Sequence, residues 1–182
     1  EYNSGLGRNA LYYNTTANNN VAVGYNALLN NTTAQNNTAI GMNCLNTNTT
    51  GTDLVGVGQA ALSANTTGNY NTAVGRQALT ANTTGSNNTA IGNLALDANT
   101  TGNYNTVVGY NALTAHTTGQ QNTALGQGTL GSSTTANYNT AVGSGALSSV
   151  TTDTDNVAMG RAALYHSTTA DNTALGSLAL YL

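Results

Sequence analysis

A seventeen-residue period runs through almost the whole chain and constrains the fold more than any other feature. One copy is NTAVGRQALTANTTGSN, residues 71–87, and positions in the repeat are numbered from its first Asn. Position five is Gly and position nine is Leu in every copy, from Gly7 and Leu11 to Gly176 and Leu180. A fixed period this short predicts a solenoid, in which each repeat forms one coil that stacks on the next.

The period leaves no place for a domain boundary, so we predict a single repeat domain over residues 1–182. The expected fold is all-β, a parallel β-solenoid of about ten 17-residue coils that is oligomeric. Neither end has an obvious polar cap, which favours end-to-end stacking of chains through exposed strand edges. The last repeat is incomplete, and the repeats begin at residues 3, 20, 37, 54, 71, 88, 105, 122, 139, 156 and 172.

Positions two to four favour a short strand, because β-branched residues precede an obligatory Gly. The turn glycines, among them Gly75, Gly92 and Gly109, are expected to adopt a backbone conformation that a Cβ would strain. The Ala-Leu pair at positions eight and nine is typical of a second strand or of one helical turn. The core is predicted to combine the aliphatic residues of position four with the leucines of position nine: Val74, Ile91, Val108, Leu79, Leu96 and Leu113.

Position three is almost always small, which suggests a surface for close packing. Neighbouring strand residues point to opposite faces, so an inward aliphatic residue at position four would turn position three outward. A strand that is apolar on both faces is usually covered on both faces. We therefore expect an assembly face for a second chain along this column, represented by Ala73, Ala90, Ala124 and Ala141.

Asn and Thr dominate the rest of the repeat, and parallel stacking would align them in hydrogen-bonded ladders. Six Asn-Thr-Thr triplets in successive repeats also match the N-glycosylation sequon. The repeated Asn is also typical of turns and ladders, which is the preferred interpretation. The candidate glycosylation residues are Asn14, Asn31, Asn48, Asn65, Asn82 and Asn99.

Composition and charge argue against several classes of function. Only 5% of residues are charged and the net charge is -3, so the chain lacks the basic footprint of a nucleic-acid-binding protein. No apolar run reaches the roughly 18 residues of a membrane helix, so no membrane insertion is expected. Cys44 replaces a common Ala, and His116 and His166 have no catalytic partner at a telling spacing and are expected in solvated turns. We predict no enzymatic activity, no bound metal and no cofactor.

Two sparse tyrosine columns form candidate faces for contact with a surface glycan or receptor, because aromatic rings have one apolar body and one polar tip. Tyr25 and Tyr110 stand at position six, where all three arginines also occur, which indicates a solvent-facing column. Tyr70, Tyr104 and Tyr138 end alternate repeats. Ordinary surface or interface packing is the preferred interpretation of both columns, and glycan contact is the alternative.

The segments NVAVG, NTAIG and NTAVG, at residues 20–24, 37–41 and 71–75, resemble the head repeats of trimeric autotransporter adhesins of the YadA type. The longer pattern NTAVGxxAL…NTTG is similar to repeats of phage-type tail fibres. The resemblance covers nearly the entire chain. It implies a left-handed parallel β-roll, a trimer in which the aliphatic strand is turned inward, and a role in cell adhesion.

These observations predict a non-enzymatic structural and adhesive segment of an extracellular fibre or filament, at a cell or virion surface. Its partners are expected to be copies of itself, as a trimer or an end-to-end filament. One alternative is an ice-binding solenoid, although the adjacent Thr83 and Thr84 would point to opposite faces of a strand. The other alternative is a carbohydrate-binding solenoid.

Overall fold

The computed structural model describes residues 2–166 and 169–181, so Glu1 and Leu182 of the predicted domain lie outside it. All regular structure in these residues is β, and eleven parallel strands form one sheet in chain order. Each strand has three residues and precedes the Gly of position five. The strands are β1 (Ser4–Leu6), β2 (Val21–Val23), β3 (Thr38–Ile40), β4 (Val55–Val57), β5 (Thr72–Val74), β6 (Thr89–Ile91), β7 (Thr106–Val108), β8 (Thr123–Leu125), β9 (Thr140–Val142), β10 (Val157–Met159) and β11 (Thr173–Leu175).

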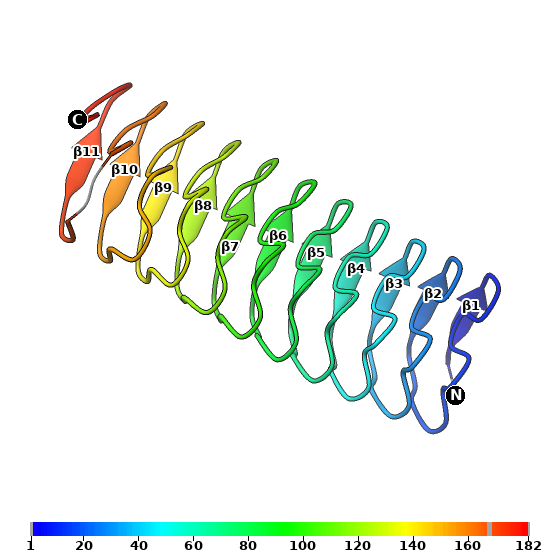
Figure 1. Ribbon diagram of the computed structural model, residues 1–182. Helices are drawn as coiled ribbons and strands as arrows, with labels where there is room; N and C mark the ends of the chain where they lie inside the picture. The colour runs from blue at the N-terminus through cyan, green and yellow to red at the C-terminus, as the bar shows by residue number, and fades with distance from the viewer. Residues whose placement is uncertain (1, 167–168, 182) are drawn as a thin grey trace.

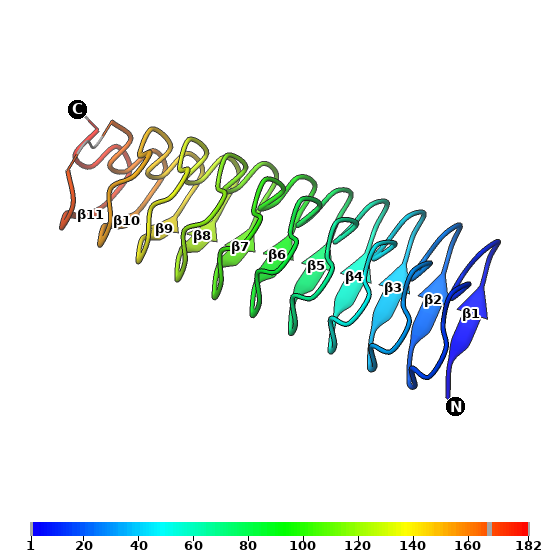
Figure 2. The ribbon, with the colours of Figure 1, turned by 60° about the horizontal axis from the view of Figure 1, so that its bottom comes forward.

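The coils stack in register, so each residue pairs with its equivalent one repeat away. In β5 and β6, for example, Thr72 pairs with Thr89 and Val74 with Ile91. Figures 1 and 2 show the resulting straight row of coils, numbered one to eleven in chain order below, with the chain ends at opposite ends of the row. The parallel β-solenoid predicted from the period is confirmed, and at ~4.8 Å per coil its length is roughly 50 Å.

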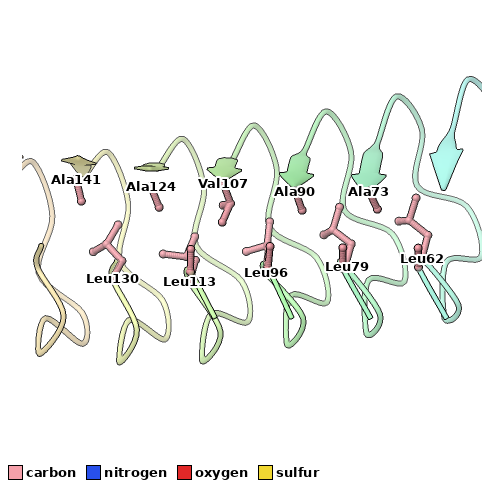
Figure 3. Packing of buried hydrophobic residues seen from close by; sticks show 14 of the residues in the cluster. Leu62, Ala73, Leu79, Ala90, Leu96, Val107, Leu113, Ala124, Leu130 and Ala141 are labelled. Carbon is pink, nitrogen blue, oxygen red and sulfur yellow. The ribbon is translucent and has the colours of Figure 1, made fainter. Parts of the chain in front are cut away.

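The apolar half of the interior is a double row of side chains. Position three points inward from the strand, and position nine points toward it from the opposite wall, as Ala90 and Leu96 show in Figure 3. Both residues are fully buried, as are Leu79 and Leu113. The leucine half of the predicted core therefore lies in the interior.

The aliphatic half of the predicted core was placed on the wrong face. Ile91 and Val108 are 39% and 38% exposed, and Val74 is half-buried, because position four points away from the coil interior. The interior is narrow, and the leucine of position nine already fills the space opposite the strand. Position three supplies the inward side chain, Ala in most coils and Val107 in coil seven, so the position-four residue on the opposite strand face must point outward.

The predicted assembly face at position three is wrong for the same reason. The alanines of this column lie inside their own coils and are not accessible to a second chain. An arginine in place of Ala90 would thus disrupt the coil interior and could not report on assembly. The residues concerned, all fully buried, are Ala73, Ala90, Ala124 and Ala141.

The Gly of position five allows consecutive coils to approach closely. Gly75, Gly92 and Gly109 have φ values of 134°, 138° and 146°. A Cβ on Gly92 would also lie 2.5 Å from the carbonyl oxygen of Gly109 in the next coil. Both the backbone conformation and the space therefore exclude a side chain at this position.

Positions eight and nine form neither a strand nor a helical turn. They belong to a turn in which position nine has a left-handed backbone, with φ of 53° at Leu96 and 51° at Leu79. Such a conformation costs a leucine about 1–2 kcal/mol. Burial of the side chain offsets this cost, because it contributes about 1.5–3 kcal/mol.

The polar half of the interior is closed by two asparagines and one carbonyl group. In coil six, the carbonyl oxygen of Gly102 at position fifteen accepts from Nδ2 of Asn88 at 2.8 Å and from Nδ2 of Asn99 at 3.1 Å. Position fifteen thereby holds positions one and twelve together within the coil. Because all three groups are buried, these bonds satisfy polar atoms that water cannot reach.

Candidate functional site

The outer sheet face consists of positions two and four of all eleven strands. Position four is aliphatic throughout, and position two is Thr in seven strands, Val in three and Ser in one. No charged residue occurs at these positions. The large side chains of this face that are most exposed are Leu6, Val21, Ile40, Val55, Ile91, Val108, Val157, Met159 and Leu175.

This face is contiguous and regular, because the strands pair in register along the whole sheet. Equivalent side chains therefore recur every ~4.8 Å along the axis, and the two outward residues of one strand lie roughly 7 Å apart. The face covers an area on the order of 500 Å², and the threonines of position two make part of it polar. The position-four column is its continuous apolar strip, and exposed apolar patches of a few hundred Å² often mark interaction sites.

The position-six column points to solvent, as its arginines indicate. Arg8, Arg76 and Arg161 are exposed, and Nε of Arg76 donates to Oε1 of Gln59 in the preceding coil at 3.2 Å. The tyrosines that end alternate repeats are also exposed, at 60% for Tyr70 and 59% for Tyr104. The two tyrosine columns are therefore accessible.

The candidate glycosylation residues form a buried ladder along position twelve. Nδ2 of Asn82 donates to Oδ1 of Asn65 at 2.9 Å and to the carbonyl of Gly85 at 3.0 Å, and the pattern recurs in neighbouring coils. Nδ2 is the atom that a glycan would modify. It is enclosed in the folded protein at five of the six sequons, and Asn14 is half-buried: the enclosed residues are Asn31, Asn48, Asn65, Asn82 and Asn99.

His116 occupies the next place in the same ladder, and the expectation of a solvated turn residue is wrong for it. The imidazole is fully buried, with Nδ1 3.2 Å from Oγ of Ser133 and Nε2 3.5 Å from Nδ2 of Asn122. A histidine does not reproduce the amide donor, so Oδ1 of Asn99 is buried without a hydrogen-bond partner. The ladder is therefore interrupted between coils six and seven.

Replacing His116 with Asn is expected to raise the free energy of unfolding by about 1–3 kcal/mol at neutral pH. The new Nδ2 would donate to Oδ1 of Asn99, as the other asparagines of the ladder do. Urea denaturation of both proteins measures the difference. As a control, His166→Asn changes an exposed histidine at position eleven and should leave stability nearly unchanged.

The same substitution should also reduce the acid sensitivity of the fold. Burial lowers the pKa of His116 from its ordinary 6.5, and a hydrogen bond with the backbone of Gly119 opposes this only in part. The unfolded chain therefore binds a proton that the folded chain does not. Stability is fully present above pH 6.5 and falls as the pH drops from there toward the folded pKa, by at most about 1.4 kcal/mol per pH unit. The free energy of unfolding of the wild type and of the His116→Asn variant is measured as a function of pH. Equal pH dependence of the two proteins would contradict this account.

The remaining candidates for chemistry are the Cys44 thiol and the His, Cys, Asp and Glu side chains that could bind a metal ion. Burial raises the pKa of the Cys44 thiol to about 12, so it stays protonated and is no nucleophile. The thiol fits because Gly56, which replaces the usual Ala, leaves room for its Sγ. Among residues 2–166 and 169–181, no three His, Cys, Asp or Glu side chains gather as a metal site, and no helix is long and apolar enough to span a membrane.

Comparison with protein-family models, with curated proteins and with solved structures finds no match. The geometry of the solenoid therefore carries the functional interpretation.

Proposed function

We propose that this chain is a structural segment of an extracellular fibre, and that copies of it associate laterally through the outer sheet face. The contiguous, uncharged outer sheet face, with its unbroken aliphatic column at position four, supports the proposal most directly. A chain acting alone would expose this surface to water over its entire length. Removing it from water would contribute about 25 cal/mol per Å² of apolar area.

A second copy is the occupant that best matches this face. The face repeats with the period of the strands, so an identical face on another copy can match it residue for residue. Neither face carries a charge that would be buried unpaired. Contact over this face would bury on the order of 500 Å² per chain, which is below the roughly 800 Å² per partner of a standard-size interface.

A trimer around a common axis is the arrangement that we propose. It would turn the aliphatic column of each chain toward the axis, in agreement with the arrangement implied by the resemblance to trimeric adhesins. An end-to-end filament uses the edges of β1 and β11 and is compatible with lateral association. Adhesion would then be the work of the surfaces that remain in solvent.

Replacing Ile91 with Arg is expected to lower the oligomeric state. The side chain is 39% exposed in the single chain, so the coil tolerates the change, but a charge would be buried at the proposed interface. Sedimentation velocity measures the oligomeric state of the wild type and of the variant. The matched control is Asn93→Arg, two residues away at the exposed position six. If the wild-type chain sediments as a monomer, lateral association is wrong.

Ice binding is a second candidate, favoured by the threonine column at position two. Thr72, Thr89 and Thr106 project from the outer sheet face in register, whereas the adjacent Thr83 and Thr84 do not lie in a strand. A flat array of hydroxyl and methyl groups with constant spacing suits the surface of a crystal. This function requires the outer sheet face to be free in water. Thermal hysteresis of a monomeric chain would support it and would contradict lateral association.

A further inference from the structure

A hollow of about 350 Å³ lies on the turn segments of coils one and two. It is within the size range of small-molecule sites. Its residues occupy positions six, seven, ten and eleven, so it shares no residue with the outer sheet face. The hollow is lined by Asn9, Tyr12, Tyr13, Tyr25, Asn26 and Leu29.

Three tyrosines form the aromatic part of the hollow. Tyr12, Tyr13 and Tyr25 are 65%, 53% and 45% exposed. The rings of Tyr12 and Tyr13 stand nearly perpendicular, at 86°, with their centroids 4.9 Å apart. Rings in this arrangement present walls in two orientations to one ligand.

Two amides form the polar part, and their orientation is fixed by hydrogen bonds. Nδ2 of Asn9 donates to Oδ1 of Asn26 at 3.0 Å, and Nδ2 of Asn26 donates to Oδ1 of Asn43 at 3.2 Å. Both asparagines also have left-handed backbones, with φ of 61° and 55°. Each Nδ2 group has a second N–H that can donate to a ligand.

The aromatic residues of the hollow are departures from the repeat. Positions ten and eleven hold Tyr12 and Tyr13 in coil one and Tyr165 and His166 in coil ten, but small or polar residues in coils three to nine, such as Thr80 and Ala81. The solenoid therefore does not need aromatic rings at these positions. Their concentration beside Tyr25 indicates a local role.

We propose that this hollow binds a neutral oligosaccharide of pyranose sugars. The flat faces of pyranose rings carry C–H groups that pack on aromatic rings, and their hydroxyls pair with amides that both donate and accept. None of the lining residues is charged, which disfavours phosphorylated, sulfated or carboxylated ligands. Leu29 adds an apolar side chain to the lining.

The test is titration of the chain with maltohexaose, cellohexaose and chitohexaose, followed by calorimetry and by tyrosine fluorescence. The chain contains no Trp, so the fluorescence of its tyrosines is directly visible. We expect saturable binding of at least one hexasaccharide. The absence of binding of all three at millimolar concentration would overturn the proposal, as would binding that high salt abolishes.

Two variants test the location of the site, and each introduces a residue type that other repeats have at the equivalent position. Tyr25→Ser introduces the residue found at Ser144, and Tyr12→Thr the residue found at Thr80, so both variants should fold. Each is expected to weaken binding about tenfold or more, because one stacking ring is lost. The control Tyr104→Asn removes a tyrosine of similar exposure outside the hollow and should bind as the wild type does. Equal affinity of all variants would overturn the assignment.

This inference is independent of lateral association. Tyr12 and Tyr25 lie outside the outer sheet face, so a monomeric chain can bind sugar and an assembled chain can fail to do so. Sedimentation and titration of the same preparation separate the two results.

Discussion

Replacing Leu96 with Asp is expected to cost more than about 4 kcal/mol of unfolding free energy. Leu96 is fully buried, and its side chain faces Ala90 between the equivalent leucines of the neighbouring coils (Figure 3). The change removes the leucine contacts, which alone are worth about 2–5 kcal/mol, and leaves a carboxylate without a partner. Since domains are stable by only about 5–15 kcal/mol, this is a large fraction of the total.

Circular dichroism during urea and thermal denaturation measures this loss. Asn93→Asp is the matched control, because it adds the same carboxylate at an exposed position of the same coil. We expect the control to change stability by less than about 0.5 kcal/mol. Unchanged melting of Leu96→Asp would show that the leucine column is not the core.

Gly92→Val is expected to have the second largest effect, a loss of several kcal/mol. The φ of 138° is unfavourable for valine, at a cost of about 1–3 kcal/mol. The added Cβ would also meet the carbonyl group of Gly109, which is backbone and cannot rotate away. Overpacking of this kind costs about 1–3 kcal/mol more.

Gly128→Ala separates the steric effect from the loss of a glycine. Gly128 has a positive φ of 62°, but a Cβ there would meet no atom within 4 Å. We expect this control to cost only about 1 kcal/mol, because the left-handed region near this φ is accessible to alanine. Equal losses for Gly92→Val and Gly128→Ala would contradict the close-approach explanation.

The period alone predicts most of the architecture, because one repeat per coil forces equivalent residues to stack in register. Hydrophobicity could not tell which of positions three and four points into the coil interior, since both positions are apolar. The informative residue is the Asn of position one, which shares a strand face with position three. Asn88 is buried, and its Oδ1 accepts from the backbone N–H of Asn105. An Asn at position one with an Ala at position three, as most repeats have, therefore marks the inward face.

Other features depend on contacts that the sequence does not reveal. A left-handed backbone is unusual for leucine, so the conformation of Leu96 follows only from the closed coil around it. The Asn-Thr-Thr motif at Asn82 satisfies both a sequon and a ladder, and burial decides between them. His116 at position twelve was recognisable as a ladder position only once the ladder was known.

The two asparagine ladders bear on how the rod would carry tension along its axis. The position-one ladder is interrupted at Leu54, where the position-twelve bonds continue from Asn48 through Asn65 to Asn82. The position-twelve ladder ends at Asn99, where the position-one bond from Asn105 to Asn88 remains intact. The two ladders are interrupted at different junctions, so no junction between described coils loses both sets of bonds. Pulling forces along the axis would therefore meet at least one of the two sets of bonds at every junction between described coils, although each ladder is interrupted.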